Sequence, residues 1–290
     1  MSDRKRVLIT GANKGIGLAT VRAVLSERDD TDVLLGSRSI ERGEAARKGL
    51  VDENPQWSDR VDVVQVDVSD DDSVEAAAKS VESLYGLVNN AGIGLGGEDM
   101  ETVLNVNTRG PRRVCRAFLP LLDPDVGRIV NVSSASGPNF VATCSRERQK
   151  TFTNPDVTWQ DIEALMEECL AIEEGNGNFE KAGFGSGSAY GLSKACLNAY
   201  TIALARENPN LTINACTPGY IETDLTRPVA EARGLEPEDM GMKPPEKGTK
   251  AALHLLFGEP GGSGWYFGSD AQRSPLDRYR SPGDPPYTEE

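Results

Sequence analysis

A phenol and an ammonium group stand four residues apart at Tyr190 and Lys194. Side chains with this spacing share one face of a helix, so both would point the same way if the segment is helical. A phenol with an ordinary pKa of about 10 exchanges its proton poorly at neutral pH, whereas a nearby ammonium favours the phenolate. Such a pair can give a proton to an oxygen that gains negative charge, and can take it back.

A glycine-rich run follows the first apolar segment of the chain. It reads Thr10-Gly11-Ala12-Asn13-Lys14-Gly15-Ile16-Gly17, after a strand predicted over 7–10 and before a helix predicted from its apolar spacing. Glycines at a strand-to-helix turn let a pyrophosphate approach the backbone, and the start of the helix offers free N–H groups and a partial positive charge. In this context the run predicts a dinucleotide site, with a plain tight turn as the alternative.

The end of the second predicted strand indicates which dinucleotide is preferred. An NAD site places an acidic residue about 20 positions after the glycines, to hold the ribose 2′-hydroxyl. Here Ser37 and Arg38 occupy that region. An arginine can bind a 2′-phosphate through two hydrogen bonds, and Lys14 can add a second positive charge. The sequence therefore favours NADP(H), although Arg38 taken alone could be a solvated loop charge.

Apolar strand-like runs alternate with helix-like runs along most of the chain, which is typical of a doubly wound sheet. We expect one Rossmann-like α/β domain over 1–270, with a parallel sheet of about seven strands and helices on both faces. The expected strands are 7–10, 32–35, 61–66, 86–89, 128–132, 211–215 and 264–267. Ligands bind at the carboxyl ends of such strands. Ser134 follows the fifth strand and could orient a substrate oxygen there, with Ser133 as the competing candidate.

Two stretches interrupt this alternation. Residues 135–187 are too many for an ordinary connection and predict a helical insertion, with Thr158 as N-cap, an apolar stripe from Ile162 to Leu170, and Gly175 at the end. Residues 271–290 are rich in proline, serine and charge, which predicts a tail that hugs the surface or is disordered.

Composition excludes several classes of function. The net charge of −14 argues against nucleic acid and anionic membranes as partners. The sequence has no apolar run long enough to cross a bilayer, and its start does not resemble a signal peptide, so we expect a cytoplasmic protein. Five widely spaced cysteines and the single histidine His254 indicate neither a disulfide framework nor a metal site.

Taken together, the motifs resemble the short-chain dehydrogenase/reductase family in order and context, over residues 4 to about 270. They are Thr10 to Gly17, Asn89-Asn90-Ala91-Gly92, Asn107, Asn131-Val132-Ser133-Ser134, Tyr190 to Lys194 and Pro218-Gly219.

The resemblance implies a catalytic group made of Asn107, Ser134, Tyr190 and Lys194. Tyr190 would be the acid/base, Lys194 would bind the nicotinamide ribose and lower the tyrosine pKa, Ser134 would orient the substrate, and Asn107 would hold a proton-relay water. The implied cofactor contacts are Thr10, Gly11, Asn13, Lys14, Gly15, Ile16, Gly17, Arg38, Asp67, Val68, Asn90, Ala91, Gly92, Tyr190, Lys194, Pro218, Gly219, Ile221 and Thr223.

Within the family the chain is similar to the monomeric carbonyl reductases, which share the Asn13-Lys14 loop, the arginine after the second strand and a long insertion before the tyrosine helix. This likeness implies a monomer, because the insertion covers the surface through which other members assemble. The segment 93–106 departs from it, since it is shorter and carries Gly94, Gly96 and Gly97. The pocket it borders can therefore differ.

The leading hypothesis is an NADPH-dependent reductase of small aldehydes, ketones or quinones. A pathway-specific ketoreductase or alcohol dehydrogenase of secondary metabolism is the second. A non-catalytic NADP-binding regulator is the third, and it is disfavoured because Tyr190, Lys194 and Ser134 are all present.

Overall fold

The structure is a computed structural model that describes residues 4–94 and 97–288. Its centre is an eight-stranded sheet of order β3-β2-β1-β4-β5-β6-β7-β8, in which β8 alone runs antiparallel to its neighbour. The strands are β1 Lys5–Ile9, β2 Thr31–Ser37, β3 Val61–Gln65, β4 Gly86–Asn89, β5 Arg128–Val132, β6 Thr212–Cys216, β7 Tyr266–Phe267 and β8 Arg273–Ser274. The predicted Rossmann-like fold is confirmed, and β8 is an addition that the sequence did not predict.

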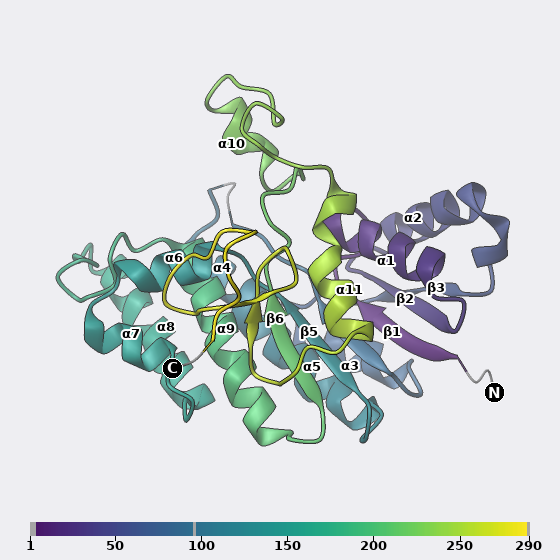
Figure 1. Cartoon of the computed structure of the whole chain (residues 1–290), viewed down its shortest axis with the longest axis horizontal. Helices are drawn as coiled ribbons and strands as arrows, with labels where there is room; N and C mark the ends of the chain where they lie inside the picture. The colour runs from purple at the N-terminus through teal and green to yellow at the C-terminus, as the bar shows by residue number, and fades with distance from the viewer. Residues whose placement is uncertain (1–3, 95–96, 289–290) are drawn as a thin grey trace.

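Helices cover both faces of this sheet (Figure 1). Apolar side chains of α1, α2 and α11 form a core with one face, and those of α3, α5, α8 and α9 belong to the core on the other. The helices are α1 Gly15–Glu27, α2 Ile40–Glu53, α3 Asp71–Lys79, α4 Met100–Leu104, α5 Gly110–Phe118, α6 Ser136–Thr143, α7 Arg146–Phe152, α8 Trp159–Glu174, α9 Ala189–Glu207, α10 Arg227–Glu231 and α11 Lys250–Phe257. No helix among the described residues is long and apolar enough to span a bilayer.

The order of the strands reverses between β1 and β4, which lie side by side although two strands separate them in sequence. A reversal of this kind opens a crevice at the carboxyl ends of the two strands, where ligands of doubly wound sheets bind. The glycine run follows β1, and Asn90 to Gly92 follow β4. The fold therefore brings these two predicted cofactor segments together.

The insertion before α9 contains α6, α7 and α8, as the length of the segment predicted. Thr158 and Asp161 form a reciprocal capping box at the start of α8, and Gly175 is its C-cap. The apolar stripe of α8 is buried in the same core as α9. Two backbone carbonyls just before α8, those of Pro155 and Val157, accept hydrogen bonds from Arg206 of α9 at 2.6 and 2.7 Å. The insertion is thus attached directly to the helix that carries Tyr190.

The segment predicted as a tail packs on the protein over its described residues, to 288. Its strand β8 pairs with β7, and the amide of Tyr287 donates to the carbonyl of Arg273 at 3.0 Å. Arg280 is buried and forms an ion pair with Asp270. Of the two alternatives that its composition left open, the structure shows a segment held against the surface.

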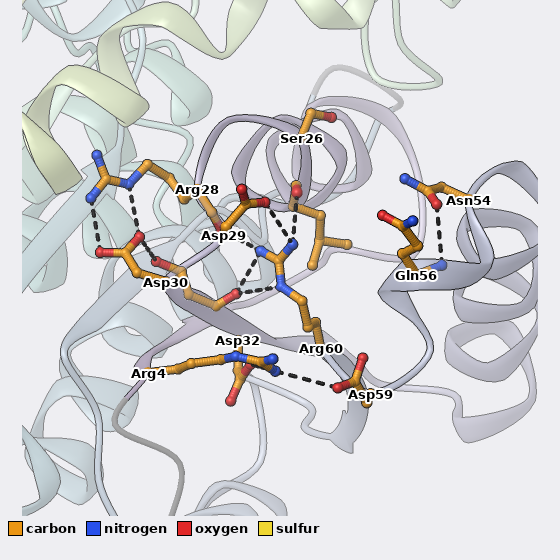
Figure 2. A network of polar contacts seen from close by, with 12 residues as sticks. Arg4, Ser26, Arg28, Asp29, Asp30, Asp32, Asn54, Gln56, Asp59 and Arg60 are labelled. Atoms are coloured by element: carbon orange, nitrogen blue, oxygen red, sulfur yellow. Dashed lines mark hydrogen bonds and ion pairs between the residues drawn. The ribbon is translucent and has the colours of Figure 1, made fainter.

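A buried arginine fixes the C-terminal end of α1 at the edge of the sheet opposite the crevice. The guanidinium of Arg60 donates to the carbonyls of Leu25 at 3.1 Å and Thr31 at 2.9 Å, and also to that of Arg28 (Figure 2). The last carbonyls of a helix have no partner within the helix, so a buried donor is needed there. Asp29 lies 3.7 Å from the same guanidinium, but its side chain is fully exposed and the ion pair is correspondingly weak.

We expect the substitution Arg60→Met to lower the free energy of unfolding by about 3 kcal/mol, because several buried carbonyls would lose their donors at once. Urea unfolding followed by circular dichroism measures this. Arg42→Met, at an exposed position on α2, is the control and should leave the transition in place. A wild-type transition for Arg60→Met would contradict the assigned role.

Candidate active site

The long helix α9 positions Tyr190 and Lys194 on the face that lies next to the end of β5. Ser188 caps this helix by accepting a hydrogen bond from the amide of Gly191 at 3.1 Å. A Cβ atom at Gly191 would lie 2.9 Å from Phe140 of α6, and one at Gly137 of α6 would lie 3.0 Å from the backbone of Lys194. Glycine at both positions therefore lets α6 lie directly against the first turns of α9.

The ammonium group of Lys194 is buried beneath the tyrosine. Its Nζ donates to the carbonyl of Val132 at 3.0 Å and lies 5.7 Å from the centre of the Tyr190 ring. Because burial penalises the charged form, the pKa of Lys194 falls from 10.5 to about 8. The group still carries its charge for most of the time at neutral pH, close to the phenol.

Burial raises the pKa of Tyr190, and the polar influence of the nearby Ser134 hydroxyl opposes the rise. The competing candidate Ser133 faces elsewhere, since its Oγ donates to the backbone carbonyl of Lys194 at 3.3 Å. The geometry thus places Ser134 at the phenol and gives Ser133 a contact with the backbone of α9.

Asn107 lies in a wide helical turn, Asn105–Arg109, that joins α4 to α5 with π-helical hydrogen bonding. Its Nδ2 donates to the carbonyl of Ile93 at 2.8 Å and to Oγ of Ser193 at 3.0 Å, and its Oδ1 accepts from the amide of Ile93 at 2.9 Å. The side chain therefore ties the loop after β4 to α9, one residue before Lys194.

Gly92 fits between these groups, because a Cβ atom there would lie 3.3 Å from Asn107 Oδ1 and 3.6 Å from Lys194 Nζ. In the segment 93–106, which departs from the carbonyl reductases, Gly96 lies outside the described residues.

The glycine run after β1 forms a tight cradle against the segment after β4. A Cβ atom at Gly17 would lie 2.5 Å from Nδ2 of Asn90 and 2.6 Å from the carbonyl of Gly11, distances that no real side chain tolerates. Gly11 has a φ of +62°, in the left-handed region that favours glycine. Thr10 Oγ1 accepts from the amides of Asn90 at 3.0 Å and Ala91 at 3.1 Å. The backbone here is shaped to admit a pyrophosphate.

The ends of β2 and β3 place the predicted adenosine contacts at the same edge of the sheet. Arg38 is exposed, and no hydrogen bond or ion pair of its side chain occurs among the described residues. Asp67 accepts hydrogen bonds from the amide and hydroxyl of Ser69, and Val68 is buried. Lys14 is paired through its Nζ with Asp224 at 2.6 Å, and its contact with the cofactor stays a prediction.

That ion pair links the glycine run to the loop after β6, which carries the predicted residues 218–223. Ile221 is buried and forms a bridge with Lys243, so the chain between them leaves the body of the protein and returns. This excursion contains α10 and projects away from the sheet (Figure 1). Gly219 has a φ of +92°, and Thr223 donates its amide to Oγ1 of Thr226 at 3.0 Å.

A cavity of about 280 Å³ lies in front of Ser134. Sequence reasoning found its inner side but missed its outer wall, which comes from the segment predicted as a tail. The signal available was the position of this segment directly after the carboxyl end of β7. The lining residues are Ser134, Ala135, Ser136, Pro138, Asn139, Thr217, Gly219, Tyr220, Tyr266, Gly268, Ser269, Ser274, Arg278, Tyr279, Arg280 and Pro282.

We expect the substitution Lys194→Met to raise the unfolding temperature of the cofactor-free protein at pH 7. The folded pKa of about 8 lies below the unfolded value of 10.5, so below pH 8 the wild type carries the full penalty of a buried charge. The penalty shrinks as the pH rises toward 10.5, and the difference between the two proteins should shrink with it.

Thermal unfolding of both proteins at pH 7 and pH 10 measures this change. Lys150→Met, at an exposed position on α7, is the control and should show no such pH dependence. A difference that widens toward pH 10 would contradict the predicted direction.

Comparison with known proteins places the chain in a family. Residues 5–146 match the family described as short chain dehydrogenase. The chain is 33% identical to human carbonyl reductase (NADPH) 1 over 276 residues, which cover 89% of this chain and 92% of that protein. It is 34% identical to rat carbonyl reductase (NADPH) 3 over 280 residues, which cover 90% of this chain and 94% of that protein.

Solved structures give the same result. The menthone neomenthol reductase from Mentha piperita superposes with a TM-score of 0.74 at 28% identity, covering 92% of this chain and 99% of that one. For the salutaridine reductase from Papaver somniferum the TM-score is 0.76 at 26% identity, covering 91% and 99%. With this similarity over most of its length, the chain belongs to the short-chain dehydrogenase family.

Proposed function

We propose that this protein reduces an aldehyde, ketone or quinone carbonyl to the alcohol, using NADPH as the hydride source and Tyr190 as the proton donor. One observation carries the proposal: Tyr190 lies close enough to the Ser134 hydroxyl for that group to act on its pKa, beside the buried Lys194 and at the cavity that Ser134 lines. The similarity to proteins named as NADPH-dependent carbonyl reductases supports the same chemistry.

The residues present fit a dinucleotide, because the Gly11 and Gly17 cradle leaves no room for side chains where a pyrophosphate would pass. NADPH, when bound, supplies the hydride. Thr10 to Gly17 would hold its phosphates, Asp67 and Val68 would flank the adenine, and Asn90 to Gly92 with Pro218 to Thr223 would border the nicotinamide. Lys194 would bind the ribose next to it.

The proton comes from Tyr190. Because burial keeps the phenol pKa above its ordinary value, the group is protonated at neutral pH, which is the state required to donate to a carbonyl oxygen. Ser134 donates a hydrogen bond to the same oxygen and stabilises its growing negative charge. The nearby ammonium of Lys194 then stabilises the tyrosinate that the proton leaves behind.

The preference for NADPH over NADH would rest on Arg38. This arginine directly follows Ser37, which stands where NAD-binding chains carry an acid, and its exposed side chain is available for a 2′-phosphate. Lys14 can assist once it leaves Asp224. The named NADPH specificity of the two carbonyl reductases agrees with this assignment.

We expect the wild type to oxidise NADPH with a panel of aldehydes, diketones and quinones, and Tyr190→Phe to lose at least about a hundredfold in kcat, because the proton donor is removed. Absorbance at 340 nm follows the reaction. Tyr85→Phe, which removes a phenol at the amino end of β4, is the matched control and should keep its activity.

The same panel of carbonyl compounds decides between a broad carbonyl reductase and a pathway-specific ketoreductase. Turnover of a single ketone class would favour the pathway-specific ketoreductase, the hypothesis supported by the likeness to the menthone and salutaridine reductases. Tight NADPH binding without turnover of any carbonyl would contradict the proposed activity. The remaining hypothesis would then be a non-catalytic NADP-binding regulator.

We expect Arg38→Gln to lower the ratio of NADPH to NADH in kcat/KM by about tenfold or more, because the 2′-phosphate would lose two charge-assisted hydrogen bonds. Steady-state rates with each cofactor give the ratio. Arg116→Gln removes the same charge from an exposed position on α5 and serves as the control. An unchanged ratio would show that another group selects the cofactor.

We propose that the protein is a monomer, since the insertion covers the helices beside α9. Trp159 at the start of α8 stacks edge-on with Tyr200 of α9, and Arg112 of α5 lies 4.3 Å above the Trp159 ring. Arg109 forms ion pairs with Glu163 of α8 and Glu101 of α4, both at 2.7 Å. Light scattering should give a mass near 31.2 kDa, and a mass of twice that or more would refute the proposal. The expected cytoplasmic location stays a prediction.

A further inference from the structure

The segment after β7 folds back over the catalytic cavity and forms its outer wall. The amide of Gly268 donates to the carbonyl of Gln272 at 2.8 Å, which turns the chain into β8. Residues 275–286 then form a loop whose ends meet where Tyr287 bonds to Arg273. Both ends of this loop are therefore attached to the sheet, and its residues 278–280 and 282 line the cavity.

Arg280 anchors the loop from inside. Its side chain is 6% exposed, and its three nitrogens are all engaged. Nη2 contacts both oxygens of Asp270 at 2.5 and 2.6 Å, Nε donates to Oγ of Ser274 at 3.0 Å, and Nη1 donates to the carbonyl of Asp284 at 2.6 Å. Its charge is balanced by Asp270, so Arg280 positions the wall and has little capacity left for a ligand.

Arg278 has a different environment, two residues away on the same wall. Its side chain is 60% exposed, with Nη1 bonded to Asp277 at 3.0 Å and the guanidinium 5.5 Å from the ring of Tyr287. Within the described part of the chain, Nε and Nη2 have no hydrogen-bond partner. The pair with Asp277 is solvent-exposed and made through a single nitrogen, which makes it weak.

In the described part of the chain, the charged residues that line the cavity are two arginines, Arg278 and Arg280, although acidic residues outnumber basic ones by 45 to 31 in the sequence. Because Asp270 balances Arg280, the positive charge available to a ligand is that of Arg278. Ser134 and Arg278 line the same cavity, and Arg278 also borders a neighbouring pocket with Tyr287. A molecule whose carbonyl reaches Ser134 therefore has the side chain of Arg278 in the same lining.

We propose that the substrates of this protein are carbonyl compounds that also carry a carboxylate, and that Arg278 binds this carboxylate while the carbonyl lies at Ser134 and Tyr190. The inference rests on the proposed carbonyl reduction and adds the substrate class. Arg278 is a specificity-determining residue, Arg280 a positioning residue for the wall, and the planar guanidinium suits a carboxylate through two parallel hydrogen bonds.

A matched pair of aldehydes tests this proposal: 4-carboxybenzaldehyde and its methyl ester, each assayed with NADPH. In the wild type the carboxylate should have the higher kcat/KM. Arg278→Gln should lower kcat/KM for the carboxylate by about tenfold or more, through KM, and leave the ester unchanged. Arg116→Gln, with the same loss of charge on exposed α5, should change neither rate.

Other outcomes overturn the assignment. If Arg278→Gln slows both aldehydes equally, the arginine acts by packing the loop; if it slows neither, it does not contact the substrate. A wild type that prefers the ester contradicts the substrate class while leaving carbonyl reduction intact.

A binding measurement keeps the test independent of turnover. Calorimetry of 4-carboxybenzaldehyde with the Tyr190→Phe protein, in the presence and absence of the added Arg278→Gln change, should show weaker binding without Arg278. Equal affinities would overturn the proposal even if no carbonyl were reduced, and absent turnover with Arg278-dependent binding would refute only the proposed function.

Discussion

The ammonium group of Lys194 is held beneath the tyrosine by a single hydrogen bond to the carbonyl of Val132, at the end of β5. A buried charge is costly, and water around it would weaken its effect on the phenol. The surrounding elements keep water away. The helix α9 contacts β5 and β6 on one side and α4, α6 and α8 on others, and its residues from Gly191 to Ala205 are buried with the single exception of Ile202. The long insertion, through α6 and α8, therefore helps to keep Lys194 buried.

The sequence predicted the sheet well because a parallel sheet buried on both faces leaves a simple signature. Each of its central strands is a short, nearly continuous apolar run, as in Val7-Leu8-Ile9. The strand β8 has no such signature, since it consists of Arg273 and Ser274. The segment around β8 is held by the ion pair between Asp270 and Arg280. Composition alone does not reveal a contact between residues ten positions apart.

The site likewise has features that the sequence predicts and features that it does not. Groups that act through local spacing, such as Tyr190 with Lys194 or the glycines after β1, could be predicted because a helix or a turn fixes their geometry. Contacts between distant segments could not be predicted. The pairing of Lys14 with Asp224 and the outer wall of the cavity depend on how loops meet after folding. Fold and family therefore follow from the sequence more readily than substrate range does.

The wide turn at Asn105–Arg109 gives this active site an unusual sensitivity to chain length. The amide of Gly110 bonds to the carbonyl of Asn105, five residues back, so the helix between α4 and α5 holds one residue more than a regular turn. Losing any one residue from this turn would restore the ordinary helical register. Because each residue of an α-helix contributes about 100° of rotation, the side chains inside the shortened turn would change direction, and Asn107 would lose its hydrogen bond to Ser193. In an otherwise continuous helix, a single-codon deletion would thus be more damaging than most substitutions.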